Sequence, residues 1–121
     1  MIGIDTACIS RIRKALENAA FKARVFTQSE IEYCDGKPDG AQSYAGIFCA
    51  KEAVVKALGV GFGNGIMPRD IEIAHDDFGA PYVIAHGNAK SVLRDRDIRV
   101  SISHDGDNAV AVAQIVESER R

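Results

Sequence analysis

The centre of this chain reads Phe48-Cys49-Ala50-Lys51-Glu52-Ala53-Val54-Val55-Lys56-Ala57-Leu58-Gly59 and predicts a helix with an unusual placement of charge. Most of its side chains are those of Ala, Val, Leu and Cys, which indicates a helix largely surrounded by protein. Residues four apart lie on one face of a helix, so Phe48, Glu52 and Lys56 form one row. A carboxylate and an ammonium in partly apolar surroundings are costly unless they are paired, bind a metal or take part in chemistry.

Two interpretations of this row are open from the helix alone. Glu52 and Lys56 form an exposed pair on the helix surface, worth a few tenths of a kcal/mol, or they belong to a functional site. Residues elsewhere in the chain must distinguish the two. The helix itself is expected to run from about Ala41 to Leu58, and Gly59 is well suited to end it.

Other helices are predicted on both sides of the central one. Ser10 is a suitable N-cap for a helix through about Ala20, because apolar residues recur there at helical spacing. The run Thr-Gln-Ser-Glu at 27–30 is a capping-box signature that starts a short helix ending before Asp35. A further short helix is expected over about 88–94.

Short apolar or alternating segments predict the strands. They are expected at about 2–9, 70–75, 81–86, 99–104 and 109–116, with turns at 76–79 and 105–108. Because helices come before a mostly antiparallel set of strands, the fold class is α+β.

The composition is that of an ordinary globular domain. With 121 residues, 46% of them hydrophobic and 26% charged, the chain can bury one core, so residues 1–121 are expected to form one domain. The net charge of -2 argues against bulk attraction to nucleic acid or to an anionic membrane. A local basic patch lies near the start of the chain and consists of Arg11, Arg13, Lys14, Lys22 and Arg24.

The expected location is the cytoplasm. No apolar run approaches the roughly 20 residues needed to span a bilayer, and the start of the chain lacks the features of a signal peptide. The three cysteines, Cys8, Cys34 and Cys49, form neither a Cys-x-x-Cys pair nor a zinc spacing. An odd number of thiols without a secretion signal fits reduced cysteines, and Cys8 and Cys49 are expected to be small core residues.

Asp5 and the pair Ser103-His104 also interrupt otherwise apolar elements. Asp5 follows Ile-Gly-Ile near the end of an expected strand, which fits either a carboxylate bonded to backbone amides or a ligand of a hard metal. Two carboxylates with water suit Mg²⁺, which often shares phosphate oxygens, whereas the sequence offers no ligand cluster for zinc. Ser103 and His104 fit a turn cap and an exposed strand end, and His104 equally fits a donor to a bound anion.

Taken together and in order, several segments resemble the holo-[acyl-carrier-protein] synthase family, the small phosphopantetheinyl transferases. The matching segments are 3–5, 9–12, 26–30, 45–59, 70–73, 79–81 and 101–104. The Lys-Glu-Ala-x-x-Lys-Ala core at 51–57 is specific, and the ordered set covers nearly the whole chain. The resemblance implies a phosphopantetheinyl-transferase-like fold, in which an antiparallel sheet packs around the long central helix.

The activity that the resemblance implies is transfer of the 4'-phosphopantetheine arm from coenzyme A to a serine of an apo acyl carrier protein, with release of adenosine 3',5'-bisphosphate. The nucleophile then lies on the partner. Asp5 and Glu52 are implied to hold Mg²⁺ and Lys56 to meet the phosphates, so these three are the candidate catalytic residues. A metal-ordered water or Glu52 is implied to accept the serine proton.

The same resemblance implies binding residues and partners. Coenzyme A is implied to contact Lys56, with Ser103 and His104 near its adenosine phosphates and Pro81 near its adenine. Arg11 is implied to face the acidic recognition helix of the acyl carrier protein. The family is usually a homotrimer with active sites shared across subunit interfaces, and neither nucleic acid nor membrane is an expected partner.

The chain departs from the family pattern at three places. Ile47 stands where the family commonly has an arginine that helps bind a coenzyme A phosphate, Ala7-Cys8 replace an acidic residue, and Pro68-Arg69 replace an aromatic one. These departures fit a specialised carrier protein, such as one of polyketide or antibiotic assembly, rather than the general one of fatty acid synthesis. The competing interpretations are a non-catalytic homologue that binds coenzyme A or carrier protein, and a purely structural domain.

Overall fold

Two antiparallel sheets and a set of helices form the protein, whose computed structural model describes residues 1–118. The three-stranded sheet has the order β1-β5-β4, and β2 pairs with β3 in a separate hairpin. All strand pairings are antiparallel, and the predicted α+β class is confirmed. The elements in chain order are β1 (Ile2–Cys8), α1 (Ile9–Ala15), α2 (Ala19–Val25), α3 (Gln28–Asp35), α4 (Gly40–Leu58), η1 (Pro68–Asp70), β2 (Ile71–His75), β3 (Pro81–Ala85), α5 (Gly87–Leu93), β4 (Asp97–Asp105) and β5 (Asn108–Val116).

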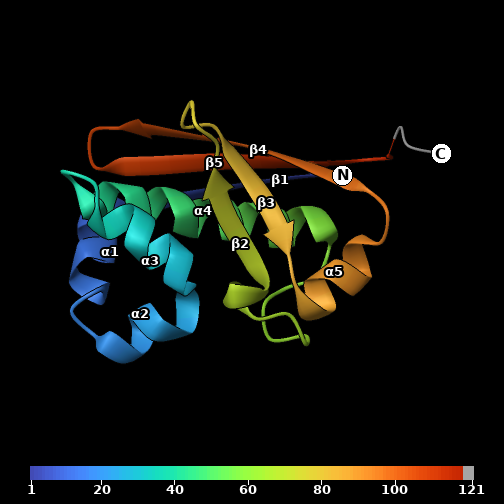
Figure 1. Ribbon diagram of the computed structural model, residues 1–121, viewed down its shortest axis with the longest axis horizontal. Coiled ribbons are helices and arrows are strands. Elements are labelled where there is room, and N and C mark those ends of the chain that lie inside the picture. The colour runs from blue at the N-terminus through green and yellow to red at the C-terminus, as the bar shows by residue number, and fades with distance from the viewer. Residues whose placement is uncertain (119–121) are drawn as a thin grey trace.

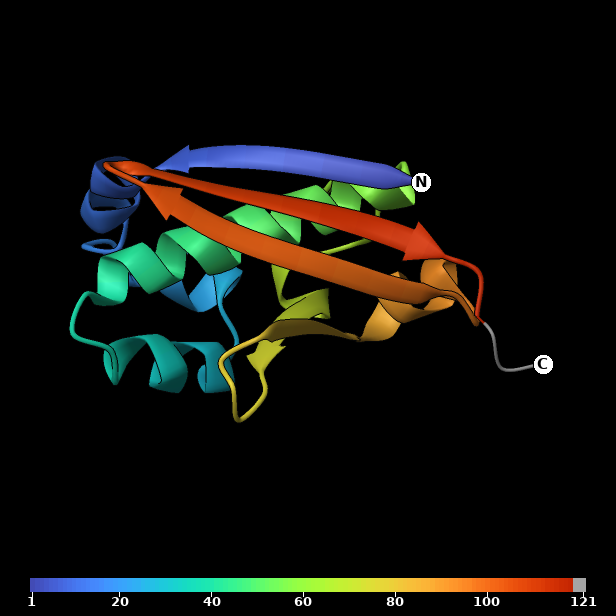
Figure 2. The same cartoon turned by 90° about the horizontal axis from the view of Figure 1, so that it is seen from above.

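Helix α4 lies at the centre of the molecule. Figure 2 shows β1, β5 and β4 running along one side of it, while the hairpin β2–β3 and the helices α1–α3 lie on its other side (Figure 1). Both faces of α4 are therefore covered, which explains why most of its side chains are buried. The start of β1 and the end of β5 lie near the same end of α4 (Figure 2).

Small residues allow the sheet to approach α4 closely. A Cβ atom on Gly3 of β1 would lie 2.0 Å from the Ala53 carbonyl oxygen, so only glycine fits at this crossing. The inward positions of β5 are alanines 109, 111 and 113, all fully or almost fully buried. Because these side chains are short, β1 and β5 pack directly on the backbone of α4, and residues of β1 come within reach of its charged row.

The sheet has one covered and one open face, since successive side chains of a strand alternate between faces. Gly3, Asp5 and Ala7 of β1 point towards α4, whereas Ile2 and Ile4 point outward and are 69% and 60% exposed. The outward positions of β5 include Val110 and Val112. An apolar strip therefore lies on the open face of the sheet.

The helical region after β1 differs from the prediction of one helix starting at Ser10. Helix α1 begins at Ile9 with Cys8 as its N-cap and ends at Ala15, and a second helix, α2, starts at Ala19. The Asn18 side chain accepts hydrogen bonds from the amides of residues 20 and 21, which starts the new helix. The Ser10 hydroxyl instead donates to Asp107 across the sheet end, at 2.7 Å. The prediction was wrong because it took the helical spacing of apolar residues to continue through Asn18, although Asn18 caps a new helix.

The predicted start of α3 and the predicted end of α4 are confirmed, whereas α3 ends at Asp35 rather than before it. The capping box is present, with Thr27 accepting from the Glu30 amide and Glu30 accepting from the Thr27 amide. Gly59 follows the last residue of α4 with φ at 78°, the left-handed conformation that glycine adopts without strain. The long helix therefore ends where the sequence predicted.

The cysteines only partly follow their prediction. Cys8, Cys34 and Cys49 are free thiols, and Cys49 is fully buried as expected. Cys8, however, is not a core residue: it is half-buried at the end of β1 and donates to Asp107 at 2.9 Å. Within residues 1–118, no helix combines the length and apolar character needed to cross a membrane.

Candidate active site

Asp5 lies in the middle of β1, opposite Ala111 of β5, and its carboxylate points towards α4. Lys56 on α4 donates to Asp5 Oδ1 at 3.1 Å and to the Ile4 carbonyl oxygen at 3.0 Å. Asp5 is thus neither at a strand end nor bonded as a turn carboxylate. The salt bridge that Lys56 forms joins Asp5 rather than Glu52, so the interpretation as an isolated helix-surface pair is wrong.

Glu52 completes a group of three charged residues on two adjacent elements. Burial raises the pKa of Glu52, the neighbouring Asp5 carboxylate raises it further, and Lys56 lowers it. A carboxylate whose pKa is raised by a second carboxylate beside it marks a place where a cation is favourable. Because Lys56 is 53% exposed and Asp5 is 18% exposed at the side chain, an outside ligand can reach the group.

The donor set fits a hard cation that keeps part of its hydration. Within residues 1–118 no cluster of three or more His, Cys, Asp or Glu side chains could hold a metal. A metal at Asp5 and Glu52 would therefore take two carboxylate ligands and complete its shell from water or from a substrate. Mg²⁺ is bound in this manner in phosphate-handling sites.

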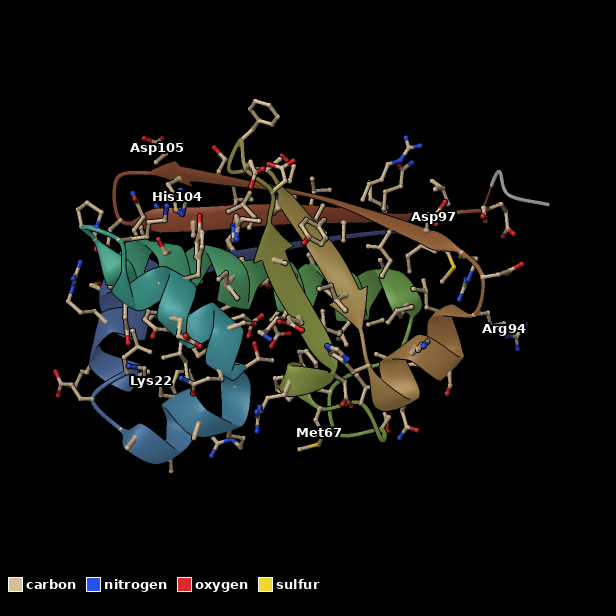
Figure 3. All side chains as sticks on the ribbon, viewed as in Figure 1. Lys22, Met67, Arg94, Asp97, His104 and Asp105 are labelled. Carbon is tan, nitrogen blue, oxygen red and sulfur yellow. The ribbon has the colours of Figure 1, made fainter. Side chains whose placement is uncertain are left out.

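A pocket of about 170 Å³ lies on the other side of α4. It contains Pro81 from the hairpin and His104 from β4, two residues for which the family resemblance implies contact with coenzyme A. The His104 ring nitrogen Nε2 is 3.2 Å from the Gln42 carbonyl oxygen, which places it over the first turns of α4 (Figure 3). The complete lining is Tyr33, Ser43, Gly46, Ile47, His75, Gly79, Pro81, Ile102 and His104.

Sequence reasoning missed two aromatic residues of this pocket. The rings of Tyr33 and His75 stack face to face, with centroids 3.9 Å apart. Lys37 makes a cation–π contact with Tyr33, its Nζ lying 4.6 Å from the ring centroid. Tyr33 comes from α3 and His75 from the end of β2, so nothing local in the sequence links them. Ile47 is also in the lining and is 1% exposed, so the departure from the family arginine gives this wall an apolar side chain.

Ser103 is not brought into the pocket. It neighbours His104 on β4, and consecutive strand residues face opposite sides of a sheet. Ser103 therefore lies on the open face, in a shallow hollow with Ile4 and Val112. Within one chain, the structure brings Pro81 and His104 together and separates Ser103 from them.

Arg11 is exposed on α1 and lines a hollow beside the charged row of α4. This hollow also includes Thr6 of β1, next to Asp5, and Phe48 of α4, one turn before Glu52. The predicted partner-binding residue thus lies on the same side of α4 as the carboxylates. Of the basic patch, Arg13 pairs with Asp39 at 3.7 Å and Lys22 with Asp35 at 3.5 Å.

Comparison with known proteins identifies the class. Residues 1–113 match the family model of the 4'-phosphopantetheinyl transferase superfamily. The holo-[acyl-carrier-protein] synthase of Clostridium tetani is 47% identical over 98% of this chain and 95% of its own length. The chain therefore belongs to the 4'-phosphopantetheinyl transferase superfamily and, within it, to the holo-[acyl-carrier-protein] synthase family of transferases.

One solved structure and one much longer protein are also similar to this chain. The structure of Helicobacter pylori holo-[acyl-carrier-protein] synthase in complex with coenzyme A superposes with a TM-score of 0.85 and 36% identity, over 95% of this chain and 99% of that one. The fatty acid synthase subunit alpha of Saccharomyces cerevisiae is 47% identical over 93% of this chain, which spans only 6% of that subunit. The predicted family, fold and enzyme class are thereby confirmed.

Proposed function

We propose that this protein transfers 4'-phosphopantetheine from coenzyme A to a serine of an apo acyl carrier protein, in an Mg²⁺-dependent reaction that releases adenosine 3',5'-bisphosphate. The observation that carries the proposal is the group formed by Asp5, Glu52 and Lys56, in which Lys56 binds Asp5 at 3.1 Å across β1 and α4. Two carboxylates and an ammonium on rigid elements suit a pyrophosphate and its cation.

The reaction joins the serine Oγ of the carrier protein to the β-phosphorus and breaks the bond from that phosphorus to the bridging oxygen of adenosine 3',5'-bisphosphate. Asp5 and Glu52 would hold Mg²⁺, which neutralises pyrophosphate charge when bound. Lys56 stabilises the charge that develops on the departing phosphate. The raised pKa of Glu52 makes it a suitable acceptor for the serine proton, directly or through a water.

The pocket beyond α4 suits the nucleoside end of coenzyme A. Pro81 and the stacked Tyr33–His75 pair supply flat apolar surface for adenine, and His104 supplies a donor for a phosphate. Ser103 would contribute only from the open face of the sheet. Because that face also exposes Ile2 and Ile4, a homotrimer that shares sites between subunits is part of the proposal.

The carrier protein is expected to dock over α1. Arg11 is exposed there, in the hollow that leads to Phe48 and the carboxylates, so an acidic helix at Arg11 would present its serine towards Glu52. The departure from the family pattern at Ile47 favours a specialised carrier protein, such as one of polyketide assembly, over the general carrier protein of fatty acid synthesis. The reaction is proposed to take place in the cytoplasm.

A panel of apo carrier proteins tests the function. Each is incubated with the protein, coenzyme A and Mg²⁺, and its mass is measured. Gain of one 4'-phosphopantetheine arm on at least one carrier is expected, and omission of Mg²⁺ should abolish it. Binding of coenzyme A without any mass gain would favour the alternative, a non-catalytic homologue, for which Ile47 is the one supporting observation.

A further inference from the structure

A second charged pair, Glu30 with Lys51, lies buried on a different face of α4 from the carboxylates. Lys51 Nζ is 2.9 Å from Glu30 Oε1, and the two side chains are 1% and 0% exposed. Burying two charges removes their hydration at a cost of several kcal/mol, which an ion pair only partly recovers. Such a pair is weak evidence of stability, so its presence here calls for another explanation.

Every polar atom of this pair is used. Lys51 Nζ donates to the carbonyl oxygens of Pro68 at 2.9 Å and Ile71 at 2.6 Å, in addition to Glu30. Glu30 Oε1 also accepts from the Thr27 amide at 2.8 Å, and its Oε2 accepts from the Ile73 amide at 2.8 Å. An ammonium has three donors, and all three are engaged. The network therefore joins α3, α4, η1 and β2 at fixed distances.

Three of these elements, α3, α4 and β2, also line the pocket that contains Pro81 and His104. Tyr33 of that pocket lies one helical turn after Glu30 on α3, and Ile47 lies one turn before Lys51 on α4. His75 lies two residues after Ile73 on β2, on the same face of the strand. The buried pair thus joins three of the five helices and strands that line the pocket, one structural repeat away from their lining residues.

We propose that Glu30 and Lys51 are positioning residues that set the spacing of this pocket and thereby the affinity for coenzyme A. The inference rests on the proposed function, in which the pocket receives the nucleoside end of coenzyme A. The hairpin contributes only two strands, and an isolated two-stranded hairpin has little stability of its own. Its place against α4 therefore depends on contacts such as the three that Lys51 and Glu30 make to 68, 71 and 73.

The test replaces the pair by a neutral one of similar volume, in the double variant E30Q/K51M. Binding of coenzyme A is measured by calorimetry, and turnover is measured with an apo carrier protein. We expect the Kd for coenzyme A to rise about tenfold, in the range seen when a partner that supports a binding residue is removed. The kcat at saturating coenzyme A should stay within about twofold, because Glu52 projects from a different face of α4 than Lys51 and has Asp5 and Lys56 as its charged neighbours.

A core variant far from the pocket serves as the control. Ile115 on β5 is 5% exposed and pairs with Ile98, at the opposite end of the sheet from His104. I115A should lower the melting temperature and leave the Kd for coenzyme A unchanged. An unchanged Kd in folded E30Q/K51M, or an equal rise in Kd in I115A, would overturn the positioning role. If the double variant does not fold, E30D is measured instead; it keeps the carboxylate opposite Lys51 but shortens the side chain by one methylene, and it should show a smaller rise in Kd.

An NMR readout separates failure of this inference from failure of the proposed function. Amide resonances of Tyr33, Ile47 and His75 should shift in E30Q/K51M, and much less in I115A, whether or not the protein binds coenzyme A. Wild-type protein that binds no coenzyme A would refute the proposed function and leave this spacing measurement valid. Unshifted pocket amides in the double variant would refute the positioning role.

Discussion

Replacing Gly3 by alanine should push β1 away from α4 and disturb both stability and catalysis. The added Cβ would lie 2.0 Å from the Ala53 carbonyl oxygen and 2.7 Å from the Ala57 amide nitrogen, whereas real Cβ atoms essentially never approach closer than 3.0 Å. Both obstructing atoms are backbone atoms of a buried helix, so they cannot turn aside. The strand must therefore retreat by about 1 Å, the smallest shift that relieves the closer contact.

The magnitude follows from this forced shift. Overpacking of a tight core costs about 1–3 kcal/mol, which lowers the melting temperature of a domain of this size by roughly 4–12 °C. Asp5 is two residues further along β1 on the same face, so it moves with Gly3. A misplacement of about 1 Å can cost about 100-fold in rate, and we expect a loss of this order in kcat with apo carrier protein.

Thermal unfolding and turnover, measured together, check the prediction. G36A is the matched control, because Gly36 has φ at -81° and an added Cβ would meet only ordinary contacts, the nearest at 3.4 Å. This control should keep or slightly raise the melting temperature, by reducing the freedom of the unfolded chain. A G3A protein with wild-type melting temperature and wild-type kcat would refute the argument that β1 and α4 touch at this glycine.

Three further predictions concern single side chains. E52Q should reduce Mg²⁺-dependent turnover at least about 100-fold while leaving the circular dichroism spectrum unchanged, and full activity would remove Glu52 from the site. R11E should raise the KM for carrier protein much more than the Kd for coenzyme A, since Arg11 lines the hollow beside α1; equal losses would place it elsewhere. The pKa of Glu72 is lowered by hydrogen bonds from Ser29 and His86, so its stabilising effect is present above the ordinary value of 4.5 and is lost as pH falls through the lower folded value. E72Q should therefore weaken the rise of melting temperature with pH on the acid side, and an unchanged profile would contradict this.

Local patterns predicted the elements that depend on neighbouring residues. The capping box at Thr27 and Glu30 and the helix end at Gly59 were predictable, because each is formed by residues within one turn. The break between α1 and α2 at Asn18 was equally local and could have been predicted, since Asn is a favoured N-cap. The apolar periodicity that continues past Asn18 concealed it. The error there was one of interpretation.

The partner of Lys56 required the tertiary structure. Its salt bridge to Asp5 spans 51 residues and depends on β1 crossing α4 at Gly3. Nothing in the spacing of the helix distinguishes Lys56 paired with Glu52 from Lys56 paired with Asp5. Ser103 illustrates the same limit, because the strand alternation that turns it away from His104 has meaning only once the covered face of the sheet is known.

The sequence alone predicted the family and the α+β class, both confirmed, and singled out Asp5, Glu52 and Lys56 as candidate site residues, because these features are encoded in short segments whose order is itself informative. Only the tertiary structure showed that Tyr33 and His75 stack in the pocket, and that Glu30 and Lys51 join its walls. The physical reason is distance along the chain. Contacts within a helical turn follow from backbone geometry, whereas contacts between α3, α4 and β2 exist only after packing has brought those elements together.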